Sequence, residues 1–159
     1  MKIPFLKQLQ RLAGPVAHEV ELATTGPEGT LIEQAIRHLL SELPDLLMAA
    51  VVDVATGKAL ATYTTDRDLR PGVVAGFNAE AVRQVQASLR AQGTPQEKVA
   101  EMLFTLRSQL HLLRLVPSER LFVYLAVDSR DTNLAIAREV VRSGIALLEP
   151  LAEGYSVDR

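Results

Sequence analysis

The fold of this chain is decided by the apolar stretch Leu121-Phe122-Val123-Tyr124-Leu125-Ala126-Val127, which ends in Asp128. Alternate side chains of a strand point to opposite faces of a sheet, and here both sets are apolar. The stretch therefore predicts a strand in the middle of a sheet, buried on both faces. Residues 117–120 before it form a short turn, and residues 109–116 carry His111 and Arg114 among leucines. Two such segments joined by a turn predict an antiparallel hairpin.

A third strand is expected at residues 100–107. Its two alternating sets of side chains are Ala100, Met102, Phe104 and Leu106 on one side and Glu101, Leu103, Thr105 and Arg107 on the other. One side is thus strongly apolar. If this strand begins its group at the edge of the sheet, an uncovered apolar edge is a pairing surface and predicts a homodimer. Pairing within the chain is the alternative.

The N-terminal half of the chain predicts a helix followed by a second hairpin. Thr30 and Glu33 fit a capping box, so we expect a helix over residues 30–43 that Pro44 ends. Residues 46–53 are almost all apolar and predict a buried strand. The pair Thr56-Gly57 then turns the chain into a strand over residues 58–65. This turn lacks the spacing of a phosphate-binding loop.

Two further helices complete the pattern. Residues 66–76 combine charged side chains with Pro71-Gly72 and predict a loop, after which Asn78 caps a helix over residues 78–92. A final helix is expected over residues 132–148, ended by Pro150. The element order αββαβββα predicts an α+β layer architecture with a mostly antiparallel sheet. Residues 1–28 are expected to form an N-terminal extension, either a short helix or mobile, and residues 151–159 a C-terminal tail.

Composition excludes several classes of function. The chain has 159 residues, which fits one domain, and its net charge of −2 argues against a nucleic-acid partner. It has no cysteine, which removes disulfides, thiolate metal sites and a cysteine nucleophile. Its apolar runs are too short for an integral membrane segment, and its first residues lack a signal-peptide pattern, so we expect a cytoplasmic protein.

The three histidines give little indication of catalysis or metal binding. None of His18, His38 and His111 lies three or four residues from another, so the sequence predicts no metal site. His111 is the candidate for a general base, beside Ser108 or Asp128, but such an arrangement is recognised only by its geometry. An enzyme that acts through His111 is therefore the least favoured function.

Four segments together resemble the Roadblock family of dynein light chains and bacterial MglB-like regulators. They are Ala50-Val51-Val52-Asp53 through Gly57, then His111-Leu112-Leu113-Arg114-Leu115-Val116, then the apolar strand 121–128, and finally Asn133-Leu134-Ala135-Ile136-Ala137-Arg138. The order and spacing of the segments carry the resemblance, which defines a Roadblock-like domain over residues 29–150. No single motif is diagnostic.

The resemblance implies a profilin-like, three-layer α/β/α sandwich with a five-stranded antiparallel sheet, one helix on one face and two on the other. It also implies a homodimer joined through the middle helix and the neighbouring edge strand. On this chain the implied dimer interface comprises Val82, Val85, Gln86, Leu89, Met102, Phe104 and Leu106.

Members of this family commonly serve as platforms for Ras-like small GTPases, and MglB-like members stimulate GTP hydrolysis without inserting an arginine. The resemblance therefore implies a non-enzymatic homodimeric scaffold that binds such a GTPase, needs no cofactor and has no catalytic residue of its own. The implied partner-binding residues lie on the outward face of the middle helix: Glu80, Arg83, Gln84, Ala87 and Arg90. The alternative is an interaction or sensor module of the same fold for a different protein partner.

Overall fold

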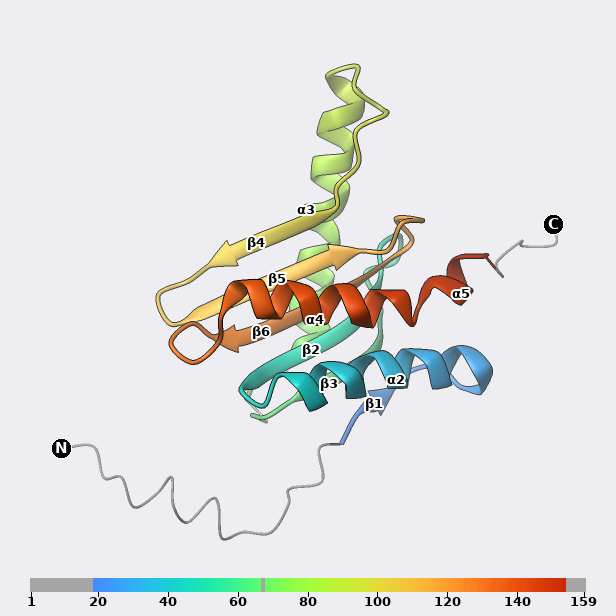
Figure 1. Cartoon of the computed structure of the whole chain (residues 1–159). Helices are drawn as coiled ribbons and strands as arrows, with labels where there is room; N and C mark the ends of the chain where they lie inside the picture. Colours follow the sequence, from blue (N-terminus) through green and yellow to red (C-terminus); the bar gives the residue numbers. More distant parts are fainter. Residues whose placement is uncertain (1–18, 67, 154–159) are drawn as a thin grey trace, which may run out of the picture.

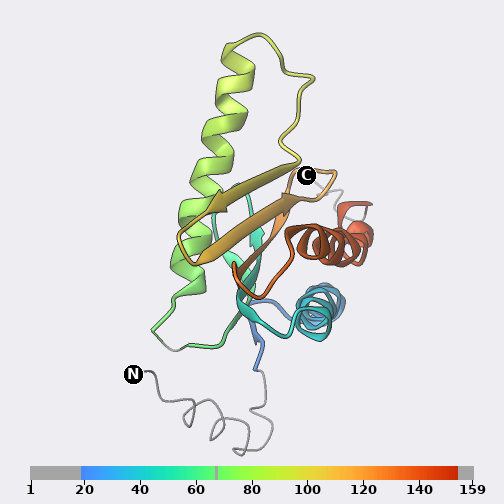
Figure 2. The ribbon, with the colours of Figure 1, turned by 60° about the vertical axis from the view of Figure 1, so that its left-hand side comes forward.

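The computed structural model of this chain describes residues 19–66 and 68–153. In chain order the elements are β1 (Glu21–Leu22), α2 (Gly26–Glu42), β2 (Leu46–Asp53), β3 (Ala59–Thr64), α3 (Pro71–Ala91), β4 (Glu101–Thr105), β5 (Gln109–Leu115), β6 (Leu121–Asp128), α4 (Leu134–Ala146) and α5 (Glu149–Glu153). The strands form one antiparallel sheet in the order β1-β3-β2-β6-β5-β4. Helix α3 covers one face, and α2 and α4 cover the other (Figures 1 and 2).

The middle of the sheet is built around β6, as the apolar stretch at its position predicted. This strand pairs with β2 on one side and with β5 on the other. All of its residues except Asp128 are buried. Its alternate side chains enter two separate cores, one shared with α2 and α4 and the other shared with α3. The three layers are therefore held together by a strand that has no polar face.

The sheet has six strands, so the expected number of five was wrong. The sixth is β1, where Glu21 pairs with Thr62 and Leu22 pairs with Ala61 on β3. It comes from the segment assigned to an N-terminal extension, and a strand of two residues is too short to show alternation in a sequence. Residues 1–18 of that extension lie outside the described residues, and residues 26–28 of it belong to α2.

Helix α2 begins at Gly26, four residues before the expected start. The predicted capping box of Thr30 and Glu33 was therefore wrong. Pro27 lies in the first turn, where its missing N–H would have no partner in any case. Thr30 is thereby inside the helix, and its hydroxyl donates to the carbonyl oxygen of Gly26 at 3.2 Å. The apolar face predicted for this helix is confirmed, with Ile32, Ile36 and Leu39 fully buried.

Helix α3 begins at Pro71, so the loop expected over residues 66–76 was wrong in its second half. Asn78 is not a cap but a buried residue in the third turn of the helix. Pro71-Gly72 was interpreted as a loop signal, although a proline at the start of a helix fits its fixed φ angle. The helix is long enough that its C-terminal half extends beyond the β4 edge of the sheet (Figures 1 and 2).

Helix α4 begins where the sequence placed it, to within two residues. The side-chain oxygen of Asn133 caps it by accepting a hydrogen bond from the N–H of Ala135 at 2.8 Å. Pro150 does not end this helix, which stops at Ala146. Pro150 is instead the second residue of α5, where a proline removes no helical hydrogen bond. The expected boundary of the C-terminal tail therefore falls inside α5.

Candidate functional site

The edge strand β4 leaves one row of backbone groups without a partner strand in the described part of the chain. It pairs with β5 alone, and lies at the end of the sheet, as its position in the sequence predicted. Met102 and Phe104 are half-buried against the core on the α3 side, and Leu106, just beyond the strand, is 51% exposed. An apolar edge of this kind is a surface for strand pairing.

Helix α3 carries a second apolar side besides the one that packs on the sheet. Ala75, Asn78, Ala79 and Val82 are buried against the sheet. Val74, Phe77, Ala81 and Val85 are also spaced by three or four residues, so they line a neighbouring side of the helix. Phe77 is 75% exposed and Val85 is 38% exposed. Contiguous exposed apolar side chains, unlike isolated ones, mark candidate contact surfaces.

Helix α3, which carries the second feature, passes the β4 edge of the sheet, which carries the first (Figures 1 and 2). We call their residues the seam surface: Phe77, Ala81, Val85, Met102, Phe104 and Leu106. It differs in part from the interface implied by the resemblance. Val82 is fully buried against the chain's own sheet, while Gln86 and Leu89, further along α3, are half-buried, and Leu89 packs against the protomer's own core.

Phe77 was missed in the sequence because the helix was expected to begin at Asn78. Its signal was nonetheless present, since Phe77, Ala81 and Val85 are each four residues apart and share one side of a helix. Starting the helix at Pro71 would have included Phe77 in that row.

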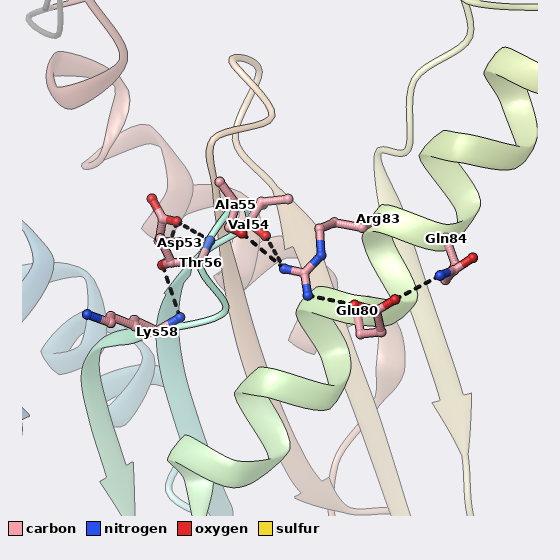
Figure 3. A network of polar contacts seen from close by, with 8 residues as sticks. All are labelled: Asp53, Val54, Ala55, Thr56, Lys58, Glu80, Arg83 and Gln84. Carbon is pink, nitrogen blue, oxygen red and sulfur yellow. Dashed lines mark hydrogen bonds and ion pairs between the residues drawn. The ribbon is translucent and has the colours of Figure 1, made fainter.

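The five residues implied as partner-binding do not all face solvent in the same way. Glu80, Gln84, Ala87 and Arg90 are exposed on the outward side of α3. Arg83 instead turns toward the β2–β3 hairpin (Figure 3). Its Nη1 donates to the carbonyl oxygen of Val54 at 2.6 Å and to that of Ala55 at 3.4 Å. This side chain therefore fastens the helix to the hairpin and is only 36% exposed.

The contacts of Arg83 continue along the helix (Figure 3). Its Nη2 donates to Oε2 of Glu80 at 2.7 Å, and Nε2 of Gln84 donates to Oε1 of Glu80 at 2.8 Å. These hydrogen bonds, from Gln84 first and then Arg83, lower the pKa of Glu80 below its usual value. The carboxylate of Glu80 on the outward side of α3 is thus already paired. The side chain of Arg90 on the same side makes no hydrogen bond or ion pair with the described residues.

The hairpin turn that receives Arg83 is itself ordered by its own side chains. Oδ1 of Asp53 accepts hydrogen bonds from the N–H of Thr56 at 2.7 Å and from the hydroxyl of Thr56 at 2.8 Å. Gly57 has a φ angle of 71°, which favours glycine, and a Cβ there would stand 3.6 Å from the Cα of Gly76 on α3. The turn and the helix therefore meet closely at this point.

Replacing Arg83 with alanine should lower the free energy of unfolding by about 1 kcal/mol, because two backbone carbonyls lose a charged donor that is partly exposed. The loss should appear in urea unfolding, with Arg90→Ala as the matched control on the same helix, which should change stability by less than about 0.5 kcal/mol. Equal stability of the two variants would show that the contact to the hairpin contributes nothing measurable.

His111 is held by two hydrogen bonds, and neither involves the Ser108 or Asp128 suggested by the sequence. Its Nε2 lies 2.8 Å from Oε1 of Gln109, an atom that can only accept, so Nε2 carries the proton. Its Nδ1 then accepts from the hydroxyl of Tyr124 at 2.8 Å. Asp128 is engaged by Arg130 at 2.7 Å. The geometry therefore provides no serine, histidine and aspartate arrangement at His111.

Burial acts on both rings of this pair. It lowers the pKa of His111 below its usual 6.5 and raises the pKa of the Tyr124 hydroxyl. Elsewhere in residues 19–66 and 68–153, no three His, Asp or Glu side chains gather as metal ligands would. None of the helices in this described part is long and apolar enough to cross a membrane.

Solved structures share this architecture at low sequence identity. MglB of Myxococcus xanthus superposes with a TM-score of 0.70 at 17% identity, over 83% of this chain and 95% of that chain. The gliding protein MglB of Thermus thermophilus gives 0.64 at 18% identity, over 85% and 98%. A Roadblock/LC7 domain of Streptomyces avermitilis gives 0.59 at 13% identity, over 78% and 96%. No protein-family model matches the sequence, and no curated protein matches it either.

Proposed function

We propose that this chain, which has the fold of the Roadblock/LC7 domains, is a cytoplasmic homodimer that binds a Ras-like small GTPase and stimulates its GTP hydrolysis. The observation that carries the proposal is the seam surface, an apolar edge strand and an apolar helix side that the described part of the protomer covers only in part. The resemblance of the sequence segments supplies the class of partner. The chain contributes no catalytic residue, so the chemistry belongs to the GTPase.

The dimer follows from joining two copies at β4. Antiparallel pairing of identical edge strands requires a two-fold axis perpendicular to the sheet, which continues the sheet through both protomers. Both α3 helices then lie on the same face and run antiparallel to each other. If they cross at Ala81, Phe77 meets Val85 of the partner subunit, because each lies four residues from the crossing point. The small side chain of Ala81 lets the helices approach closely.

The paired helices leave a broad outward face for the GTPase. On each helix this face presents Glu80, Gln84, Ala87 and Arg90, all of them exposed. Arg83 takes the role of a positioning residue, because its bonds to the hairpin fix the rotation of α3 and thereby the direction in which this face points. Glu80 and Gln84 are held by neighbouring side chains, so the face is ordered before binding.

The proposal is tested by mixing the protein with each Ras-like GTPase of its own genome, loaded with GDP or with a non-hydrolysable GTP analogue, and measuring binding by calorimetry. We expect one GTPase to bind in its GTP form and to hydrolyse GTP faster in the complex. Light scattering on the free protein should give the mass of a dimer. Failure to bind any of the GTPases in either form would overturn the proposal and leave a module of the same fold for another protein partner.

Replacing Arg90 with glutamate should weaken GTPase binding by at least about tenfold and leave the dimer mass unchanged, since the residue is exposed on the outward face and lies outside the seam surface. The matched control is Arg37→Glu on α2, an exposed arginine on the opposite face of the sheet. Equal weakening by both variants would point to a general charge effect and would remove this face of α3 from the proposal.

A further inference from the structure

The C-terminal half of α3 extends past β4, where its own sheet has ended (Figures 1 and 2). In the proposed dimer the sheet continues into the partner, so this half of the helix lies over the partner's β4 and β5. His111 is on β5, directly opposite Phe104 of the edge strand in the register, and the two side chains share the face that α3 covers. Dimerisation therefore covers His111, which is half-buried in the protomer.

The residues around His111 suit a neutral imidazole. Among the described residues, they include no acid that could pair with a protonated imidazolium. Both ring nitrogens are already satisfied, by Tyr124 and Gln109. Protonation would turn Nδ1 from an acceptor into a donor, and the hydroxyl of Tyr124, itself fully buried, would have to rotate to receive it. The charge would then remain in an apolar setting without a partner.

The groups that face His111 from each neighbouring element include no compensating acid among the described residues. Strand β4 presents Phe104, and β6 presents Ala126 and Tyr124. The sheet-facing residues of the protomer's own α3 carry no ionisable group. The nearest carboxylate on β6 is that of Asp128, which is opposite Gln109 and bound to Arg130. The half of the partner's α3 proposed to lie over this region corresponds to residues 82–91, which contain no Asp or Glu, so it adds no acid either.

We propose that the His111, Tyr124 and Gln109 network makes dimerisation proton-sensitive: the neutral imidazole fits beneath the partner's α3, and the imidazolium drives the protomers apart. The inference rests on the proposed dimer. Because the GTPase-binding face needs both helices, GTPase binding would also depend on pH, although His111 itself does not contact the GTPase.

The direction of the pH dependence follows from burial. Burial holds the pKa of His111 below 6.5 in the protomer, and covering by the partner lowers that pKa further. The dimer therefore favours the deprotonated ring. The dimer should have its full affinity above a pH of 6.5, and this affinity should decline as the pH falls below that value.

Sedimentation equilibrium on the whole chain, between about pH 5 and pH 8, tests the inference. The dimer Kd should rise at least about tenfold toward the acid end. His111→Gln keeps a neutral polar side chain and should make the Kd independent of pH. His38→Gln, on α2 at the opposite face of the sheet, is the matched control and should keep the dependence. Far-UV circular dichroism confirms that each variant is folded.

The outcomes separate this inference from the proposed function. A protein that is monomeric at every pH contradicts the dimer and, with it, both proposals. A dimer whose Kd does not change with pH, or a His111→Gln variant that keeps the pH dependence, contradicts the inference about His111 alone. A second measurement is an NMR titration of the imidazole, which should give His111 a higher pKa in a monomeric variant than in the dimer.

Discussion

Phe104→Asp should convert the dimer into a folded monomer. Phe104 lies on the free edge strand, half-buried in the protomer, and strand pairing covers it from the other side. The substitution places one unpaired carboxylate from each protomer in an apolar interface, close to the two-fold axis. An unpaired buried charge costs several kcal/mol, so the dimer Kd should rise by at least about a thousandfold. Light scattering across a dilution series measures this change directly.

The control for this variant is Thr105→Asp, the next residue of the same strand. Its side chain points to the opposite face of the sheet and is exposed, so the same charge on the same edge strand stays in water. We expect Thr105→Asp to dimerise with a Kd within a few-fold of the unmodified chain. If Phe104→Asp keeps the dimer mass at the lowest concentration measured, the chains do not join at β4.

The layers of the fold could be predicted because their signal is local. Strand β6 is apolar on both of its alternating sides, and only the middle of a sheet buries both. The edge position of β4 followed from its place at the start of the last group of strands. In contrast, β1 has two residues and is defined only by its pairing with β3, so no periodicity in the sequence could indicate it.

The start of α3 was missed for a different physical reason. Pro71-Gly72 is compatible with a loop and with the first turn of a helix, and the local sequence does not distinguish them. The close approach of the helix to the hairpin turn, at Gly57 and Gly76, is a tertiary contact between segments that a sequence does not bring together. Missing this start also removed Phe77 from the implied interface.

The roles within α3 could not be assigned from the sequence for a related reason. Helical spacing places Val82 and Val85, three residues apart, on one apolar stripe, but it does not say that the protomer's own sheet buries Val82 and leaves Val85 exposed. Arg83 and Arg90 are likewise equivalent in the sequence as two arginines on one helix. Their difference comes from the carbonyl oxygens of Val54 and Ala55, which the hairpin brings beneath Arg83 alone.

Phe77→Asp should also abolish the dimer, and it isolates the helix contact from the strand contact. The side chain is 75% exposed in the protomer, so its replacement should change the stability of the monomer by less than about 1 kcal/mol. In the dimer it is expected to meet Val85 of the partner subunit, and the two-fold axis repeats that contact. Each protomer then loses a buried aromatic ring and gains an unpaired charge, so the Kd should rise by at least about a hundredfold.

Ala87→Asp is the matched control, since Ala87 is on the outward side of the same helix and is also exposed. It should leave the dimer Kd unchanged and weaken binding of the GTPase, whereas Phe77→Asp should lose both because the binding face needs two helices. If Phe77→Asp dimerises as tightly as the unmodified chain while Phe104→Asp does not, the protomers join through β4 without pairing of their α3 helices. The outward faces would then not form one platform, and the GTPase would have to bind a single protomer.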